Sequence, residues 1–408
     1  MKKPANHKII CAAICGALVL LLGGSAASAA PRAADLPAVD QLPVIEELPD
    51  PFLMRDGSRV KTAADWTRRR EELENLIQYY EYGHLPPPLP VTAKELSSEK
   101  NEALGATEKH LLLAIGAGDK KVEYHLDLTI PLDKSGPLPV IVKGDLGWGK
   151  VAVKASENTV KEVVRRGYIL AEFNREEVAP DKDDRTTGVY TLYPDCDWGA
   201  EAAWAWGFHR TIDYLLTLEC VDRRRIAVTG HSRGGKAALL AGAMDERIAL
   251  TAPNGSGCGG AGCVRVRGPK SEGIEDILKR FPFWFHPRFK DFIGKVNRLP
   301  FDQHSVKALV APRALVSTEG LGDLWANPEG AQATYLAARE VYRFLGAEEK
   351  IGIHFREGKH EHNETDWMAL LDFADKVFFG KTVTRKFDRP AFPDSPKRFS
   401  WSAPATEK

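Results

Sequence analysis

The chain has 408 residues, and its 56 lysines and arginines are balanced by 56 aspartates and glutamates, which leaves a formal net charge of zero. A balanced charge argues against a surface that binds nucleic acid or another polyanion. The length fits one large α/β domain with insertions, or such a domain behind an N-terminal extension.

The N-terminus has the order of features that is typical of a secretory signal peptide. Lys2, Lys3 and Lys8 precede an apolar run over residues 9–22, and small residues with an Ala-x-Ala end follow. The apolar run is shorter than the ~20 residues that a membrane span requires. We therefore expect cleavage after Ala29 and an exported protein that has no membrane anchor once the signal is removed.

Few cysteines remain after such a cleavage. They are Cys196, Cys220, Cys258 and Cys263. This number is too small for a disulfide scaffold, although an exported chain could oxidise one or two pairs. None of these cysteines stands in a spacing that binds a metal ion, so we expect no metal site.

The predicted elements begin with an extended lead-in over residues 30–52. Residues 65–82 have helical spacing, and Gly83 is a stop signal. Antiparallel strands are expected at residues 108–115 and 122–130. Further apolar runs predict strands at 138–142, 168–173, 226–229, 248–252, 314–318 and 351–355, with a helix at 204–218. Strands that alternate with helices indicate a mostly parallel sheet with right-handed crossovers.

The segment after the strand at 226–229 is the most informative of the chain. Residues 230–236 read Gly-His-Ser-Arg-Gly-Gly-Lys, and a helix of small residues follows over 237–243. Strand, Gly-x-Ser-x-Gly turn and helix form the nucleophile elbow of α/β-hydrolases. The turn needs glycines around the serine, because Cβ atoms there would collide with the strand and the helix. Ser232 is therefore predicted to be a catalytic nucleophile, and a serine that only caps the helix is the alternative.

This elbow predicts an α/β-hydrolase fold, with a mostly parallel central sheet in a three-layer sandwich and an N-terminal extension. We expect the signal peptide at residues 1–29, the extension with one helix at 30–105, the catalytic domain at 106–385 and a C-terminal tail at 386–408. The loop Leu146–Gly149 is of the type that carries oxyanion-hole backbone groups in this fold.

A serine nucleophile needs a base that takes its proton and an acid that orients the base. In this fold the acid and the histidine follow the serine along the chain, each on a loop after a strand. The last predicted strand is followed by His360 and His362, which lie two residues apart, so only one of them is expected to face the serine. The strand at 314–318 is followed by Glu319 and Asp323, and glycines let the chain curl back before Asp323.

Other residues near these loops receive a structural interpretation. His304 and His354 are predicted to be packing or hydrogen-bonding residues, and His231 is expected to point away from the serine. Glu319 and Asp323 have the alternative of being surface carboxylates in a turn.

Several sequence motifs accompany the elbow over roughly residues 65–380. They are Ala203–Gly207 (AWAWG), Ala249–Gly257 (ALTAPNGSG), Phe283–Phe285 (FWF), Asp302–His304 (DQH), Ala308–Arg313 (ALVAPR) and the final His-x-His loop. Together with the elbow they resemble the glucuronoyl esterases of carbohydrate esterase family 15. That family cleaves esters between the 4-O-methyl-glucuronic acid branches of xylan and lignin alcohols. The resemblance implies a uronate ester substrate on xylan or lignin–carbohydrate material.

The resemblance also implies roles for single residues. Arg233 would help to stabilise the oxyanion beside the nucleophile Ser232. Lys236 would contact the hydroxyls of the sugar. Glu272 would be a polar sugar-binding residue, and Trp325 would line the uronate pocket.

The histidine and the acid are carried over with departures from the family pattern. His362 matches the catalytic histidine of the family, and His360 remains its rival. The usual acid of the family lies at the place of Gly255, so the acid must come from elsewhere. Some bacterial members place it where Asp323 stands.

A second departure concerns a disulfide of the fungal members. Its two cysteine positions are held here by His231 and Asn363. Both cysteines are missing together, which is consistent with a bacterial-type member of the family.

We therefore expect a serine esterase that works through a Ser232–His362–Asp323 triad and an acyl-enzyme. No cofactor is expected, and the protein is expected to be a monomer. A general carboxylesterase or acetyl-xylan esterase of the same fold is one alternative. A catalytically inactive carbohydrate-binding relative is another.

Overall fold

The structure is a computed structural model that describes residues 36–118, 120–145 and 155–405. The predicted signal peptide and the loop Leu146–Gly149 lie outside the described residues. From Leu36 onward the chain forms one compact unit. Within the described part, no helix is both long and apolar enough to cross a membrane.

A nine-stranded sheet runs through the described chain in the order β1-β2-β3-β5-β4-β6-β7-β8-β9. Pairing is antiparallel from β1 to β5 and parallel from there to β9. The strands are β1 (Val91–Asn101), β2 (Ala106–Ala117), β3 (Lys120–Pro131), β4 (Leu138–Lys143), β5 (Ile169–Phe173), β6 (Val221–His231), β7 (Leu250–Asn254), β8 (Ala314–Gly320) and β9 (Ile351–Arg356). β4, β7 and β8 are buried along their whole length, as expected for strands that are covered on both faces.

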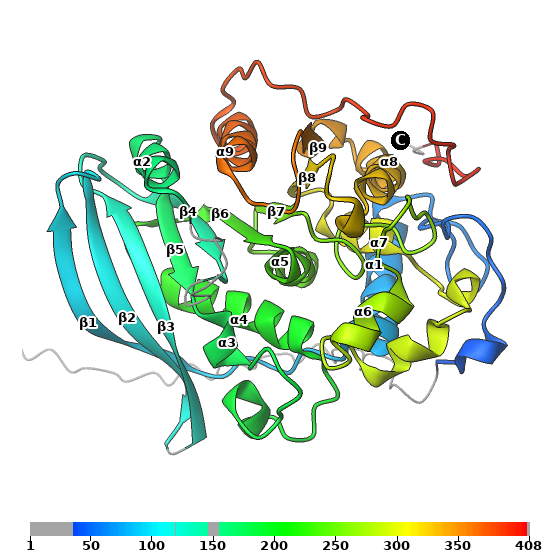
Figure 1. Cartoon of the computed structure of the whole chain (residues 1–408), viewed down its shortest axis with the longest axis horizontal. Coiled ribbons are helices and arrows are strands. Elements are labelled where there is room, and N and C mark those ends of the chain that lie inside the picture. Colours follow the sequence, from blue (N-terminus) through cyan, green and yellow to red (C-terminus); the bar gives the residue numbers. More distant parts are fainter. Residues whose placement is uncertain (1–35, 119, 146–154, 406–408) are drawn as a thin grey trace, which may run out of the picture. The chain divides into compact units, whose positions relative to one another are not determined.

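Helices cover both faces of the sheet (Figure 1). They are α1 (Ala63–Ile77), α2 (Glu157–Arg165), α3 (Arg175–Val178), α4 (Ala200–Leu215), α5 (Arg233–Met244), α6 (Ile274–Arg280), α7 (Gln303–Val310), α8 (Pro328–Phe344) and α9 (Glu364–Phe379). Val140 and Val142 of β4 belong to the apolar core on the side of α4 and α5. Ile141, between them, belongs to a second core with α9. This alternation along the strand confirms the predicted three-layer α/β arrangement.

The sequence prediction differs from the structure mainly at the start of the sheet. The helix predicted at 65–82 is present as α1, continued by a π-helical turn at Gln78–Tyr82. β1 was missed, because its side chains are mostly exposed and give no alternating apolar pattern. Since β1 pairs with β2, the sheet begins before the boundary predicted at residue 106.

The N-terminal segment and the C-terminal tail contact each other. The Leu48 N–H donates to the Arg398 carbonyl at 2.8 Å, and the Trp401 indole N–H donates to the Leu48 carbonyl at 2.7 Å. His304 of α7 fixes the same segment, because its Nε2 lies 2.8 Å from the Pro49 carbonyl oxygen. The interpretation of His304 as a hydrogen-bonding residue is thereby confirmed.

We expect His304 to make the protein less stable in mild acid. Burial lowers the pKa of His304 from its usual value of 6.5 to about 4. The unfolded chain therefore takes up this proton first, so the stability is complete above pH 6.5 and declines as the pH falls toward 4. Urea unfolding across this range should show a shallower pH dependence for His304→Asn than for the wild type. An equal dependence in both proteins would contradict the expectation.

Candidate active site

The elbow turn has the geometry that the sequence predicts. Ser232 follows β6 and precedes α5, and its φ of 56° and ψ of −121° are rare for a residue other than glycine. A Cβ on Gly230 would lie 2.2 Å from the Gly234 carbonyl oxygen, and one on Gly234 would lie 2.6 Å from Asp145 Oδ1. The strained turn leaves Ser232 partly exposed at the N-terminus of α5, where a nucleophile is expected.

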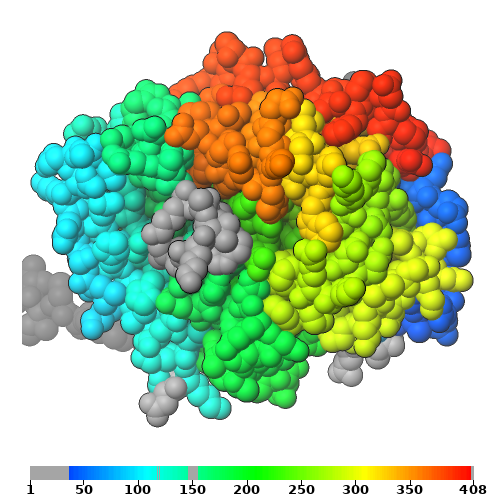
Figure 2. All heavy atoms as spheres, in the orientation of Figure 1, coloured from blue at the N-terminus to red at the C-terminus, as the bar shows by residue number. Residues whose placement is uncertain are grey.

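The loops that follow β8 and β9 are held together near the elbow turn. We call residues 321–327 the acid loop and residues 357–363 the histidine loop. The Gly322 N–H donates to the Gly358 carbonyl at 2.8 Å. A Cβ on Gly322 would lie 2.8 Å from that same oxygen, so the close approach requires glycine. Figure 2 shows the segments that carry the elbow (green), the acid loop (yellow) and the histidine loop (orange) on one face of the molecule.

Arg356, the last residue of β9, fixes the shape of the histidine loop. Its guanidinium donates to the carbonyls of Lys359 at 3.2 Å and Glu361 at 2.6 Å, which flank His360. A further bond of 2.7 Å joins it to Asp366 Oδ2 on α9. Bonds to both neighbours of His360 restrict the backbone that carries this ring. No motif in the sequence indicated Arg356, because its role depends on how the loop folds.

The two loops bring Asp323 and His360 into contact. Asp323 Oδ2 lies 2.6 Å from His360 Nδ1. The carboxylate is 5% exposed and the imidazole 42% exposed, so the acid is shielded while the ring reaches the surface. A carboxylate on Nδ1 orients the ring and leaves Nε2 to take or give a proton. This is the relation that an acid and a base have in a catalytic triad.

Glu319, the alternative acid, takes no part in that pair. It lies near the end of β8 with 1% of its surface exposed, and its Oε1 has no hydrogen-bond partner among the described residues. Burial raises the pKa of Glu319 well above its usual value, although Lys307 opposes the shift. Of the two carboxylates, Asp323 is the one that contacts a histidine of the histidine loop, so the geometry favours Asp323 as the acid.

His362 is packed into the protein instead of being paired with an acid. It is 7% exposed and stacks on Trp367 of α9, with ring centroids 5.1 Å apart. Its Nδ1 has no hydrogen-bond partner within the described ranges, and burial lowers its pKa well below the usual value. We therefore revise the expectation that His362 is the base. The acid meets the rival histidine, His360.

Gly255, at the usual place of the family acid, lies where three side chains converge. A Cβ there would lie 3.3 Å from Asp323 Oδ2, 3.6 Å from His231 Cε1 and 3.7 Å from His360 Nδ1. The space that a side chain at position 255 would enter thus already contains the Asp323 carboxylate. The sequence predicted that His231 points away from the serine. This expectation is revised, because His231 packs beside His360.

Arg233, the first residue of α5, is held by an acidic and aromatic clamp. Its guanidinium forms an ion pair with Asp181 and lies 4.5 Å from the ring centroid of Trp284 and 4.9 Å from that of Phe281. The other oxygen of Asp181 accepts from the Trp284 indole N–H at 2.9 Å. No sequence signal indicated Asp181, which lies in a polar loop. The clamp fixes Arg233 beside the elbow in advance, so the side chain does not have to reorganise during a reaction.

We expect Asp181→Asn to lower kcat about tenfold, because Arg233 loses the charge that orients it while keeping its own. KM should stay within about twofold of the wild type. Steady-state kinetics of Asp181→Asn and of the control Asp184→Asn, from the same loop, test this. Equal kcat in the two variants would remove the clamp from the mechanism.

Lys236 and Glu272 form a buried pair. Lys236 Nζ lies 3.1 Å from Glu272 Oε1, and it donates to the carbonyls of Ser256 and Cys258 at 2.5 Å each. The two side chains are 3% and 4% exposed. All the donors of the ammonium are thereby used within the protein. The expectation that Lys236 contacts sugar hydroxyls is therefore revised, and its contact with Glu272 orients that carboxylate instead.

Trp325 extends the acid loop toward Glu272. The Glu272 N–H donates to the Trp325 carbonyl at 3.1 Å, two residues after Asp323. Trp325 is 37% exposed, and the Arg280 guanidinium lies 4.5 Å from the centroid of its ring. The acid loop, which carries Asp323 and Trp325, is thus joined to Glu272 and through it to Lys236, although the three segments are distant in the sequence.

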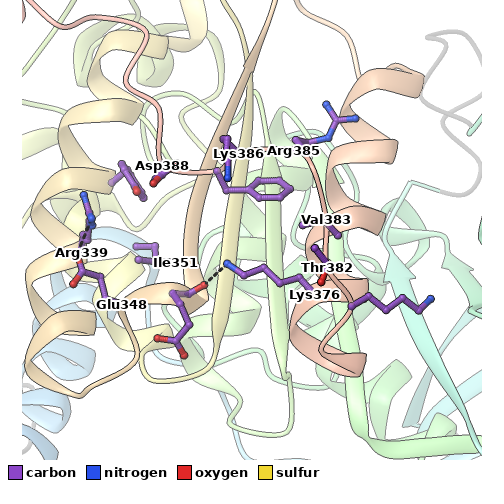
Figure 3. A pocket seen from close by; sticks show the side chains of 13 residues that line it. Arg339, Glu348, Ile351, Lys376, Thr382, Val383, Arg385, Lys386 and Asp388 are labelled. Carbon is purple, nitrogen blue, oxygen red and sulfur yellow. Dashed lines mark hydrogen bonds and ion pairs between the residues drawn. The ribbon is translucent and has the colours of Figure 1, made fainter.

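Metal and disulfide chemistry find no support in the described residues. No cluster of histidine, cysteine and carboxylate side chains there could hold a metal ion. The four cysteines of the described ranges are unpaired. A separate hollow of about 530 Å³ lies beside β9 and α8, where Arg339 and Glu348 pair at 2.7 Å (Figure 3). None of Ser232, Asp323 and His360 lines it.

Comparison with known proteins assigns the chain to a family. A family model described as "Glucuronyl esterase, fungi" matches residues 113–346, more than half of the chain. The chain belongs to the glucuronoyl esterase family. It is accordingly a carboxylic ester hydrolase with an α/β-hydrolase fold.

Two curated relatives align with most of this chain. Carbohydrate esterase MZ0003, from an unknown prokaryotic organism, is 33% identical over 392 residues, which cover 82% of this chain and 90% of the relative. The 4-O-methyl-glucuronoyl methylesterase 1 of Wolfiporia cocos is 34% identical over 331 residues, which cover 78% of this chain and 76% of the relative.

Solved structures of the family are similar as well. The carbohydrate esterase family 15 glucuronoyl esterase from Caldicellulosiruptor kristjansonii superposes with a TM-score of 0.77 at 34% identity, covering 90% of this chain and 99% of that one. A mutant glucuronoyl esterase from Sporotrichum thermophile was solved with methyl 4-O-methyl-β-D-glucopyranuronate. It superposes with a TM-score of 0.70 at 25% identity, covering 86% of this chain and 93% of that one.

Proposed function

We propose that this chain hydrolyses esters of 4-O-methyl-glucuronic acid through a triad of Ser232, His360 and Asp323. The observation that carries the proposal is the 2.6 Å contact between Asp323 and His360, in the same site as a strained elbow serine. Membership of the glucuronoyl esterase family supports the ester chemistry. The ester-linked glucuronate of xylan or lignin–carbohydrate material is the proposed natural substrate.

The reaction proceeds in two acyl-transfer steps. His360 Nε2 takes the proton of the Ser232 hydroxyl while its oxygen forms a bond to the ester carbonyl carbon. The imidazolium then gives this proton to the alkoxide oxygen as the carbon–oxygen bond to the alcohol breaks. Water attacks the acyl-enzyme with His360 again as base, and the uronic acid is released. Asp323 stays ionised and stabilises the imidazolium in both steps.

The oxyanion is stabilised at the start of α5. Backbone N–H groups point toward this end of the helix, and its dipole favours negative charge there. Arg233, fixed by Asp181 and Trp284, adds a guanidinium group beside it. Each such donor contributes roughly 3 kcal/mol to the stabilisation of the transition state.

Glu272 and Trp325 are proposed to select the sugar. The Oε1 atom of Glu272 is occupied by Lys236 and by the Cys258 N–H. Because both of these bonds use Oε1, the second oxygen is proposed to accept a hydrogen bond from a sugar hydroxyl. The exposed indole of Trp325 offers a flat face to the apolar side of a pyranose.

Glu272→Gln should raise KM for a methyl glucuronate ester by roughly tenfold, because a neutral amide accepts a weaker hydrogen bond. The rate on a small acetyl ester, which offers no sugar, should stay within about twofold of the wild type. Kinetics on both substrates measure this. A parallel loss on the two esters would mean that Glu272 supports the fold of the site instead of selecting the sugar.

The substrate class itself is tested by comparing kcat/KM on benzyl glucuronate with that on an acetyl ester. We expect a strong preference for the glucuronate, and a preference for the acetyl ester would favour a general carboxylesterase or acetyl-xylan esterase. Labelling of Ser232 by a fluorophosphonate is expected, and its absence would favour an inactive carbohydrate-binding relative.

The protein is further proposed to be exported and monomeric and to need no cofactor.

A further inference from the structure

His231 lies at the junction of the elbow and the histidine loop. It is the last residue of β6, directly before Ser232, and 4% of its surface is exposed. Its ring centroid lies 4.3 Å from that of His360, and the two planes make an angle of 44°. The mechanism above leaves this buried histidine without a task.

The tautomer of His231 follows from its hydrogen bond to Asn254. The Asn254 amide nitrogen donates to Thr318 Oγ1 at 2.9 Å and to the Thr318 carbonyl at 3.2 Å, so its amide oxygen is the atom that faces His231. His231 Nδ1 lies 2.5 Å from that oxygen, which can only accept. Nδ1 therefore carries the proton, and the ring is fixed to β7 in one orientation.

The His231 ring also contacts the far end of the histidine loop. Its centroid lies 6.1 Å from that of His362, and the planes are nearly parallel at 23°. His362 in turn stacks on Trp367 at 14°. His360, His231, His362 and Trp367 thus form a continuous row of rings that joins the histidine loop and α9 to the strand that precedes the nucleophile.

The charge state of His231 suits this place. Burial and the neighbouring His360 lower its pKa to about 4, so the ring is neutral near neutral pH. The other ionisable groups that face it are Asp145 at the end of β4, Asp323 in the acid loop and His362. A neutral ring at 4.3 Å does not oppose the imidazolium that forms on His360 during the reaction, whereas a second cation would.

We propose that His231 is a positioning residue that holds the base His360 beside Ser232 through this contact between rings. The proposal rests on the proposed triad. His231 comes from the elbow strand and His360 from a loop after a different strand, so their contact sets the distance between nucleophile and base. Its loss lets the base ring move away from Ser232 without removing any reacting atom.

Three substitutions test the proposal. His231→Ala removes the ring and should lower kcat by roughly 10- to 100-fold with KM within about twofold, because small misplacements of a base are costly. His231→Phe keeps a ring but gives up the bond to Asn254, and should keep kcat within about threefold of the wild type. His231→Leu fills the volume without a flat ring, and it replaces the alanine variant if that variant fails to fold. His354→Ala, which removes a partly buried histidine of β9, is the control and should keep the wild-type kcat.

The rate of Ser232 labelling by a fluorophosphonate gives a second readout that needs no sugar substrate. We expect it to fall with kcat in His231→Ala and to recover in His231→Phe. An unchanged kcat in His231→Ala, an equal loss in the phenylalanine variant or in the His354→Ala control, or a change in KM alone would each overturn the proposal. A wild-type protein that prefers acetyl esters but still shows this labelling pattern would refute the proposed substrate and leave the role of His231 intact.

Discussion

Replacing His360 with alanine should lower kcat/KM by at least a factor of about 1,000 while the protein stays folded. His360 is the ring that Asp323 contacts, and in the proposed mechanism it is the base that takes the proton of Ser232. The imidazole is 42% exposed, so its removal leaves little buried cavity. Initial rates on a glucuronate ester and thermal unfolding of the same preparation measure the two effects.

The matched control is His362→Phe, two residues further along the same loop. Phenylalanine keeps the stacking on Trp367 and removes both ring nitrogens. We expect kcat within about tenfold of the wild type, because a buried imidazole without an acid partner does not transfer the proton. If His362→Phe were inactive while His360→Ala kept its turnover, the assignment of the base would have to be reversed.

The elbow turn that carries Ser232 was predictable from the sequence because its signal is local. Gly230 and Gly234 are required by backbone contacts within a few residues of Ser232, so the motif carries its own structural reason. The approach of the Asp323 loop to the histidine loop was predictable for a related reason. Gly322 lies where the acid loop meets the Gly358 carbonyl, and glycines before Asp323 already indicated that the chain curls back.

The choice between the two histidines was not predictable in this way. His360 and His362 lie on one short loop, and which ring faces the acid depends on Arg356, which bonds to the carbonyls on both sides of His360. It also depends on Trp367, a residue of the next helix that binds the other ring by stacking. These are tertiary contacts that no spacing along the loop encodes.

Lys236 gives a similar lesson about burial. The sequence places it one helical turn after Ser232, near the site, and a lysine near a sugar pocket suggests direct binding. Its ammonium is in fact consumed by two backbone carbonyls and Glu272. The sequence prediction missed β1 for the opposite reason. An exposed edge strand has no buried face and therefore no alternating apolar pattern.

Asp323→Ala is expected to lower kcat by roughly 1,000-fold with a small change in KM. Asp323 is the only carboxylate that contacts the His360 ring among the described residues, and its loss removes both the orientation of Nδ1 and the charge that stabilises the imidazolium. The position of Gly255 makes this loss hard to compensate. A residue with a side chain at position 255 would have to adopt a φ of 49°, which strains any residue other than glycine. An acid introduced at this usual family position would therefore not easily take over the role of Asp323.

Glu319→Gln is the control for this substitution, because Glu319 lies four residues before Asp323 in the chain and is the alternative acid, with 1% of its surface exposed. An amide of the same shape should keep kcat within about threefold of the wild type. The rates of both variants on one glucuronate ester, with fluorophosphonate labelling of Ser232 as an independent readout, decide between the two acids. Near wild-type turnover in Asp323→Ala, together with a large loss in Glu319→Gln, would transfer the role of the acid to Glu319 and would require the acid loop to move before the reaction.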